Sequence, residues 1–376
     1  MTNSHAKKVV IVGGGIAGLA LGRALQSHDM PFSILERRHT ATDAGLAINL
    51  PGNAIQALAQ LGLREQVEAA GYPLRRRQYR TAQDKLLFEV DEDIFWGEAL
   101  RPRGMRRSAL LSILADGLPN DSIRYGAAVS SLTTHATHAE LTLADGTRSD
   151  APLVVGADGV SSTVRVALFG AEQGPGRALL ADASWRFMVP NPGVDCWTVW
   201  AGAEGMVLLM PVDHDEVYGW AATSRPQPHG EAIDTLDRMM GSFPGRVQRA
   251  VRHALSQPGE LHHSPLEEVR LDNWHIGRAA LIGDAAHATA PVWAQGAALA
   301  FEDAIVLARS LSATADIPAA LTAFEAQRRP RVAHVQKLTD AMSRAAKLPL
   351  MVRDTLLPWI GPKRYRQTYE PLKAQV

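Results

Sequence analysis

The chain contains almost no cysteine, since Cys196 is the only one in 376 residues. A single cysteine excludes an internal disulfide framework and is typical of proteins that fold in a reducing compartment. We therefore expect a cytoplasmic location. The hydrophobic content of 46% is enough for a large core, and the length allows two or three domains.

Long apolar runs are also missing. The run Val9–Val12 is followed at once by glycines, which indicates a buried strand and not a secretory signal. The chain has no uninterrupted apolar stretch of about 18 residues, the length that a membrane-spanning helix needs. A transmembrane segment is therefore not expected.

Net charge is absent too, because 39 basic residues balance 39 acidic ones. This balance gives no electrostatic reason to expect nucleic acid or a membrane as partner. We interpret the basic cluster Arg75–Arg77 as a solvated surface. Neither His262-His263 nor His287 has a carboxylate or cysteine at metal-ligand spacing, so the sequence predicts no metal site.

What the sequence does contain is a strand–turn–helix–strand pattern over residues 9–36. Its turn reads G-x-G-x-x-G: Gly13 permits a tight turn, Gly15 lets a pyrophosphate approach the backbone, and Gly18 lets helix and sheet pack closely. The helix N-terminus at Ile16 and Ala17 offers N–H groups and partial positive charge to phosphates.

Two acidic residues extend this prediction. Glu36 ends the following strand, where a carboxylate can accept hydrogen bonds from ribose hydroxyls. A second glycine–acid turn, Gly283-Asp284, occurs late in the chain, within residues 280–291. A reductase that uses only NAD does not require this second turn, whereas a longer dinucleotide would use it.

With these motifs in this order, the chain resembles the FAD-dependent aromatic hydroxylases, or group A flavoprotein monooxygenases, of the salicylate and urate hydroxylase type. The resemblance covers nearly the whole length. It implies an α/β fold with a Rossmann-like FAD-binding domain, an inserted mixed β-sheet substrate domain and a C-terminal helical region. Besides the glycine fingerprint, it implies cofactor contacts from residues along the chain: Glu36, Arg37, Ala47 within the segment 44–53, Arg107, Val129, Asp158 of Gly156–Gly159, Asp284, Pro291, Ala294, Gln295, Gly296, Ala297 and Ala298.

One loop departs from the family pattern. Family members commonly carry Pro-x-x-Gly-Gln-Gly-x-Asn, whereas this chain has Ala294 and Ala298 at the first glycine and at the asparagine. We expect alanine to disfavour a left-handed backbone at 294. Backbone contacts to the flavin survive both changes, and the movement of the ring is the property that we expect to be affected.

The expected domain limits follow the same resemblance. Residues 1–177 are assigned to the FAD-binding domain, with a part of the substrate sheet near 72–102; residues 178–275 form the substrate domain. Residues 276–376 complete the first domain and add C-terminal helices, which we expect prolines 330, 349, 358 and 362 to interrupt.

The substrate domain is marked by aromatic residues at strand spacing: Trp185, Phe187, Trp197, Trp200, Tyr218 and Trp220. Most of them are expected to be core, with one face left to line a pocket. Tyr218 and Arg186 are candidates for orienting a phenol or carboxylate. Trp293 is a candidate for contact with flavin or substrate, with core packing as the alternative.

The implied reaction is reduction of FAD by NADH or NADPH, capture of O2 as a flavin C4a-hydroperoxide and hydroxylation of a small aromatic or heteroaromatic substrate. Only one Rossmann fingerprint exists, so the nicotinamide coenzyme is expected to bind transiently. Two alternatives stay open: another flavin oxidation on the same scaffold (epoxidation, ring expansion or halogenation), and a non-catalytic flavoprotein that sequesters a ligand.

Overall fold

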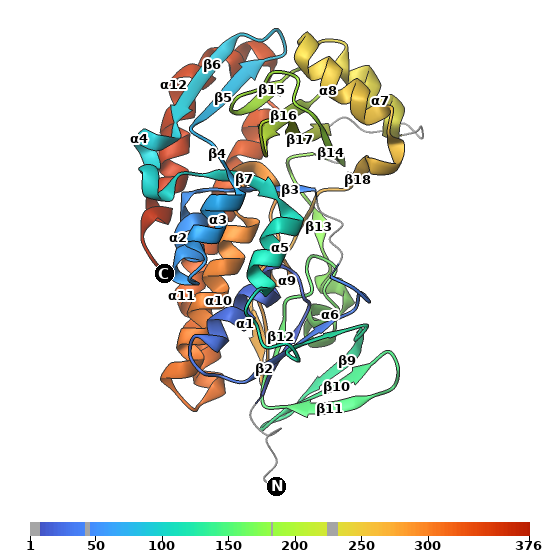
Figure 1. The fold of residues 1–376 in the computed structure, drawn as a ribbon, viewed down its shortest axis with the longest axis vertical. Helices are drawn as coiled ribbons and strands as arrows, with labels where there is room; N and C mark the ends of the chain where they lie inside the picture. Colours follow the sequence, from blue (N-terminus) through green and yellow to red (C-terminus); the bar gives the residue numbers. More distant parts are fainter. Residues whose placement is uncertain (1–7, 42–45, 182, 224–231) are drawn as a thin grey trace.

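A mostly parallel sheet forms the lower half of the molecule and a mixed sheet forms the upper half (Figure 1). The computed structural model describes residues 8–41, 46–181, 183–223 and 232–376. Every helix within these ranges is too short or too polar to cross a bilayer.

Six strands of the described chain form the parallel sheet, in the order β20-β21-β12-β1-β2-β8, with only β20 antiparallel. Their bounds are β1 Val9–Val12, β2 Phe32–Glu36, β8 Ile123–Tyr125, β12 Val154–Gly156, β20 His275–Ile276 and β21 Ala279–Leu281. The central strands are short apolar runs because both faces of a parallel sheet are covered. The predicted strand–helix–strand unit over residues 9–36 is confirmed.

Helices from distant parts of the chain cover this sheet. Helix α1 packs on α10 and α5, and α10 also contacts α2 and α11. The bounds in this half are α1 Ile16–Gln26, α2 Gly52–Gln60, α3 Arg64–Ala70, α5 Arg107–Ala115, α6 Thr163–Phe169, α9 Asp284–His287, α10 Gly296–Ala313 and α11 Ile317–Ala346.

Smaller elements flank and join the two halves. An antiparallel ribbon contains the predicted hairpin at Asp145-Gly146, and a three-stranded sheet lies between the halves (Figure 1). The ribbon is β9 Val129–Thr134, β10 Ala139–Leu143 and β11 Arg148–Ala151; the three-stranded sheet is β3 Ala47–Leu50, β7 Arg103–Arg106 and β4 Tyr72–Pro73; β13 Gly176–Arg177 pairs with β19 Glu267–Glu268. Single turns are α4 Glu92–Trp96, η1 Glu98–Leu100, η2 Ala171–Gln173, η3 Pro258–Glu260, η4 Pro291–Trp293 and η5 Glu370–Lys373.

The mixed sheet has the order β18-β14-β17-β16-β15-β5-β6, and only β15 and β5 run parallel. Its strands are β5 Arg76–Thr81, β6 Leu86–Asp91, β14 Ala183–Pro190, β15 Trp197–Ala201, β16 Met206–Pro211, β17 Glu216–Thr223 and β18 His262–Ser264. Two strands within residues 72–102 thus join strands from 183–264 in one sheet. Side chains alternate between its faces, so one face packs on helices and the other faces the lower half.

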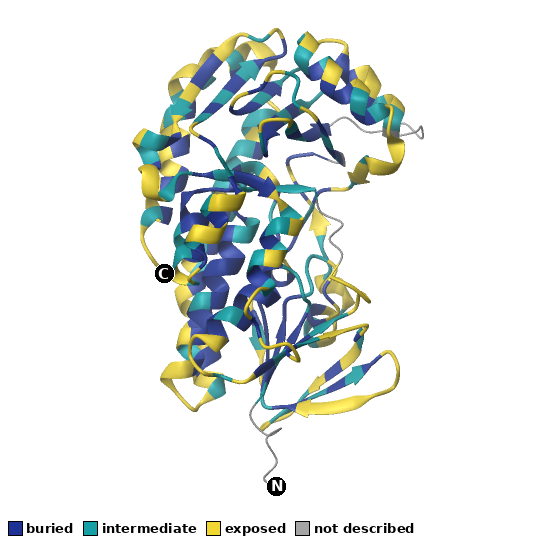
Figure 2. Cartoon of the chain, in the orientation of Figure 1, coloured by how far each residue is buried: buried dark blue, intermediate teal, exposed yellow. Residues whose placement is uncertain are grey.

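The outer face of the mixed sheet is an apolar layer under two helices that the sequence patterns did not predict, α7 Ala232–Met240 and α8 Gly245–Leu255. Trp185, Phe187 and Trp200 are buried in this layer and are core residues, as expected. Figure 2 shows the strands of this sheet largely buried.

The expected proline interruptions are wrong at three of four positions. Helix α11 continues through Pro330, and α12 (Leu350–Tyr369) continues through Pro358 and Pro362. Only Pro349 separates two helices, at the N-terminal boundary of α12. Proline removes one helical hydrogen bond, but packing on both sides can hold the helix together.

The interpretation of Arg75–Arg77 as a solvated surface is also wrong for one residue. Arg77 is 1% exposed, its Nε donates to Glu92 Oε1 at 2.9 Å, and its guanidinium lies 4.2 Å from the ring centroid of Trp197. Alternation along β5 turns this side chain inward, and burial of its charge is compensated by the carboxylate. Arg75 and Arg76 are the partly exposed members of the cluster.

Candidate active site

The glycine turn lies at the carboxyl end of β1 and is bounded closely by its neighbours. Gly13 has φ +111°, and a Cβ there would lie 2.5 Å from the carbonyl oxygen of Ala157 at the end of β12. Gly14 N donates to Glu36 Oε2 at 2.7 Å. Because parallel strands end at one edge, the motifs after β1, β2 and β12 meet there.

Gly15 and Gly18 have different roles in this turn. A Cβ on Gly18 would lie 1.9 Å from Gly13 O, so only glycine permits this approach of α1. A Cβ on Gly15 would meet nothing within 4 Å, although Gly15 directly precedes α1. Open space at a helix N-terminus is where a phosphate group can approach the backbone. Ile16 and Ala17 form the buried first turn of the helix.

Glu36 also accepts a hydrogen bond from the backbone N–H of Arg38 at 2.9 Å. A carboxylate has about four acceptor positions, so it can still accept from ribose hydroxyls. Ala127 N donates to Glu36 O at 2.9 Å, which brings the strand that begins at Val129 beside this carboxylate. Arg37 is exposed.

Asp158 is engaged by its own chain. Its carboxylate accepts from Thr163 N at 2.8 Å, Val164 N at 3.2 Å and the hydroxyl of Ser162, all at the start of α6. Burial raises the pKa of Asp158, and these hydrogen bonds act in the opposite direction. Arg165 on α6 donates to Ala285 O at 3.0 Å. The Gly156–Gly159 motif is thereby tied to the late glycine–acid turn, and direct contact of Asp158 with a cofactor stays a prediction.

Asp284 is exposed, although residues 279–283 and 285–288 are all buried. The preceding Gly283 has φ +59°, and a Cβ there would lie 3.0 Å from Ala17 Cβ of α1. On its other side, a Cβ on Gly296 would lie 3.5 Å from Asp284 Oδ1. Asp284 therefore presents its carboxylate between the glycine turn and the N-terminus of α10.

Arg107 begins α5, as predicted, and its backbone N donates to Leu46 O at 3.2 Å. This bond places Arg107 beside Ala47, the first residue of β3; Ala44 and Gly45 of the same segment lie outside the described residues. On β3, both amide atoms of Asn49 are buried with no hydrogen-bond partner in the described structure. An orphaned buried amide is a place where a ligand can complete the hydrogen bonds.

The loop from Pro291 to Ala298 begins with the turn η4 and leads into α10 at Gly296, close to the predicted helix start. Ala294 adopts φ 53° and ψ 37°, so the loop has a left-handed backbone here although alanine disfavours it. The neighbouring Gln295 explains how it is held: its Nε2 donates to Asn53 Oδ1 and its Oε1 accepts from Asn53 Nδ2, both at 3.0 Å. This buried amide pair fixes the loop to α2.

Because an L-residue is strained in this region, Ala294→Gly is expected to raise the free energy of unfolding by up to about 1 kcal/mol. Chemical denaturation of the purified protein measures it. The matched control is Ala297→Gly, one residue into α10. This variant is expected to lower the free energy of unfolding by roughly 0.5–1 kcal/mol. Equal losses in both variants would show that the strain at Ala294 is not relieved by glycine.

A buried ion network behind this loop was not anticipated from the sequence. Asp303 is fully buried and accepts from Gly283 N at 2.9 Å and from Arg328 Nε at 2.8 Å, and its Oδ2 lies 2.7 Å from His287 Nε2. Next to it, Glu302 pairs with both Arg328 and Arg331 at 2.8 Å. The only sequence signal was Glu302-Asp303 within the otherwise apolar run of α10.

A second contact reaches the loop from the C-terminal helix. Tyr369 at the end of α12 donates its hydroxyl to Trp293 O at 2.6 Å, and the two rings meet edge to face with centroids 6.0 Å apart. Trp293 itself is buried, and its indole N–H has no acceptor in the described ranges. Trp293 is therefore packed in the core and still has an indole N–H available as a hydrogen-bond donor.

The inner face of the mixed sheet lies against this loop. Tyr218 and Trp220 belong to one apolar cluster with Ala290 and Val292. Arg186 is opposite Trp220 in the register, so its side chain emerges on the same face. Burial raises the pKa of Tyr218 to about 12, opposed by the positive charges of Arg186 and Arg107. The phenol is therefore protonated at neutral pH and can donate a hydrogen bond.

The structure thus gathers the glycine turn, Glu36, Asp284 and the loop 291–298 at one edge of the parallel sheet, facing an aromatic sheet. In the described ranges, no group of three or more His, Cys, Asp or Glu side chains could hold a metal ion. Residues 6–339 match the family described as FAD binding domain. The chain belongs to this FAD-binding family. Gly15 and Asn49 fit the binding of FAD. Gly15 leaves open space beside the expected path of the cofactor, and the buried amide of Asn49 offers it hydrogen-bonding atoms that have no partner in the described structure.

This FAD-binding protein is similar over most of its length to curated proteins and to solved structures. It is 30% identical to 2-heptyl-3-hydroxy-4(1H)-quinolone synthase of Pseudomonas aeruginosa over 97% of both chains. It is also 30% identical to the FAD-dependent urate hydroxylase of Klebsiella pneumoniae over 86% of both chains. The crystal structure of Klebsiella pneumoniae HpxO with FAD and uric acid superposes with a TM-score of 0.84 at 26% identity, covering 98% of this chain and 95% of that one. The expected α/β fold and the FAD cofactor are confirmed.

Proposed function

We propose that this chain is a single-component FAD-dependent monooxygenase that hydroxylates a small aromatic or heteroaromatic compound. The observation that carries the proposal is the inner face of the mixed sheet, where Tyr218 and Trp220 pack toward Ala290 and Val292 beside the loop 291–298. Relatives that the chain matches over 84–93% of their length are named as hydroxylases and monooxygenases. An apolar wall with a few polar groups suits a planar substrate.

FAD would lie along the edge where the motifs meet. Glu36 would accept hydrogen bonds from the adenosine ribose, and the N-terminus of α1 would bind the pyrophosphate at Gly15. Asp284 would accept hydrogen bonds from the ribityl chain, and Arg107 would contact the phosphate and ribityl region. The backbone of residues 291–298 would hold the flavin ring.

The chain's own groups would then tune and shield the reaction. When bound, the flavin supplies hydride acceptance and activation of O2. The N-terminus of α10 stabilises negative charge next to Gly296 without a basic side chain. Tyr218, protonated at neutral pH, would donate to a substrate oxygen, and Arg186 would attract a substrate carboxylate or phenolate. The indole N–H of Trp220 is a further donor without a described acceptor.

NADH or NADPH would deliver the hydride as a transient co-substrate. The chain has one glycine fingerprint of the Rossmann type, and FAD would use it. A coenzyme that binds only during reduction needs no domain of its own. Steady-state oxidation of each coenzyme by the holoprotein would identify the preferred one.

The deciding experiment screens small aromatic acids, phenols and heterocycles against the yellow holoprotein. A substrate is expected to accelerate NAD(P)H oxidation, with O2 uptake and a product heavier by one oxygen atom. A ligand that binds without stimulating oxidation would support sequestration instead, and a chloride-dependent product would support halogenation. If the protein takes up no FAD, the proposal is wrong.

Asp284→Ala is expected to raise the Kd for FAD about tenfold to a hundredfold, because hydrogen bonds to a charged acceptor contribute about 1.5–3 kcal/mol each. Equilibrium titration of apoprotein with FAD measures the change. Asp121→Ala, an exposed aspartate before β8, is the control and should leave the Kd unchanged. Unaltered affinity in Asp284→Ala would remove this aspartate from the cofactor site.

A further inference from the structure

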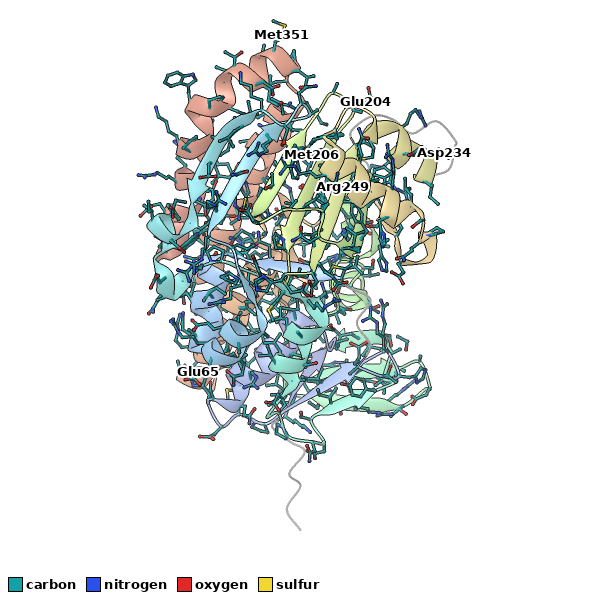
Figure 3. All side chains as sticks on the ribbon, turned by 45° about the horizontal axis from the view of Figure 1, so that its top comes forward. Glu65, Glu204, Met206, Asp234, Arg249 and Met351 are labelled. Atoms are coloured by element: carbon teal, nitrogen blue, oxygen red, sulfur yellow. The ribbon has the colours of Figure 1, made fainter. Side chains whose placement is uncertain are left out.

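Six large exposed apolar side chains lie in one stretch, from just after α11 to the middle of α12. Met351 is 85% exposed and Trp359 is 77% exposed, and Figure 3 shows Met351 projecting away from the body of the protein. The α12 stripe, as we call it, consists of these two and four neighbours that are 37–43% exposed: Leu348, Leu350, Val352 and Leu356. Patches of this kind mark interaction sites more often than isolated exposed residues do.

Three members of the stripe lie on one side of the helix, and Met351 lies about a quarter-turn from them. Val352, Leu356 and Trp359 are four and three residues apart, which places them on one face. The opposite face is occupied: Gly361 and Tyr365 are buried, and a Cβ on Gly361 would lie 2.3 Å from Phe88 of β6. Helix α12 therefore packs on the protein along one side and exposes Val352, Leu356 and Trp359 on the other.

Basic residues surround the stripe at both ends. Between positions 344 and 366 the chain has six basic residues and one acidic residue, Asp354. That carboxylate is already paired with Arg353 at 2.8 Å. At the other positions the charge is positive and exposed: Arg344, Lys347, Lys363, Arg364 and Arg366.

This charge pattern distinguishes between two partners for the stripe, a second copy of the chain and a lipid surface. A second copy of the chain packed by two-fold symmetry would bring one basic end against another, in either helix orientation, and like charges oppose such a contact. An anionic lipid surface offers negative headgroups to the basic ends and an apolar boundary to the stripe.

We propose that the α12 stripe binds the surface of membranes that contain anionic lipids, with α12 lying in the plane of the interface. Met351 and Trp359 enter the boundary between headgroups and acyl chains. Lys347, Lys363 and Arg364 contact the headgroups. The contact is independent of the proposed oxidation and requires no change in the fold.

Co-sedimentation of the holoprotein with vesicles tests the proposal. Binding is expected to vesicles of equal parts phosphatidylglycerol and phosphatidylcholine, weakening with salt, and to be much lower with phosphatidylcholine alone. Met351→Ser/Trp359→Ser is expected to lower the partition coefficient roughly tenfold or more. Lys363→Glu/Arg364→Glu is expected to remove the preference for anionic vesicles.

Ile94→Ser is the matched control, because Ile94 is 80% exposed on α4 and lies outside the stripe; it should bind as the wild type does. Bound flavin and the thermal transition of each variant report on folding. The proposal is overturned if the wild type sediments with neither vesicle, or if Met351→Ser/Trp359→Ser binds as the wild type does. It is also overturned if that variant turns a dimer into a monomer, by light scattering, without changing vesicle binding.

Discussion

Arg328→Met is expected to lower the free energy of unfolding by about 3–5 kcal/mol, because it leaves buried carboxylates with less compensating charge. Arg328 is fully buried and pairs with Asp303 and Glu302 at 2.8 Å. Chemical denaturation of the holoprotein measures the loss. Arg75→Met, whose partly exposed pair with Asp93 spans 3.1 Å, is the control and should cost less than about 1 kcal/mol. Equal effects would mean that the network contributes no more than a surface pair.

The pH dependence of the same variant has a definite sign. Burial pushes the pKa of Asp303 up, but His287 and Arg328 more than offset it and hold that pKa below its ordinary value of 3.8. The contribution of this carboxylate to stability is therefore present above about pH 4 and is lost as the pH falls further. Without Arg328 the carboxyl group is more easily protonated. Acid unfolding of Arg328→Met is expected to begin at a higher pH than that of the wild type.

Gly15→Ala is expected to weaken FAD binding while leaving the apoprotein as stable as the wild type. The new methyl group meets nothing within 4 Å and the backbone there, with φ −84°, suits any residue, so the fold has no reason to change. Overpacking against a bound pyrophosphate costs roughly 1–3 kcal/mol, which raises the Kd for FAD about tenfold to a hundredfold. Titration of apoprotein with FAD and denaturation of the same sample measure the two quantities.

Two further variants are compared with Gly15→Ala. Gly259→Ala, in η3, also meets nothing within 4 Å and should change neither quantity. Gly18→Ala places its Cβ 1.9 Å from Gly13 O, so both stability and FAD binding are expected to fall. If Gly15→Ala retains wild-type affinity, the pyrophosphate does not pass this glycine.

The sequence was most informative where function depends on a few consecutive residues. The glycine turn, the helix start at Arg107 and the Gly283-Asp284 turn were predicted because each needs a particular backbone or charge at a fixed spacing. Their convergence followed from a rule for parallel sheets. The roles of individual residues toward FAD remain predictions.

The missed features depend on contacts between distant segments. Ala294 is left-handed because Asn53, on another helix, holds its neighbour Gln295. The partners of Asp303 come from α9 and α11, and no local pattern pairs them. Helix α11 passes through Pro330 between Arg328 and Arg331, which both pair with Glu302 of α10. Local propensity cannot report such tertiary restraints.

Net charge over the whole chain does not describe the charge of any one surface. The equal numbers of acidic and basic residues removed any electrostatic argument for a membrane partner. Residues 344–366 nevertheless carry six basic side chains against one acidic one. Binding depends on the charge that one surface presents, so the net total says little about it.

The parallel sheet also constrains how the protein is made. Strand β1 begins at Val9, but the loop that would hold the flavin ring ends only where α10 begins at Gly296. At usual elongation rates, a ribosome needs roughly 15–60 s to synthesise the residues between them. The glycine turn therefore leaves the ribosome long before the rest of the cofactor site exists. A product that terminates before residue 296 lacks the complete loop that would hold the flavin ring, and we expect it to retain FAD less well.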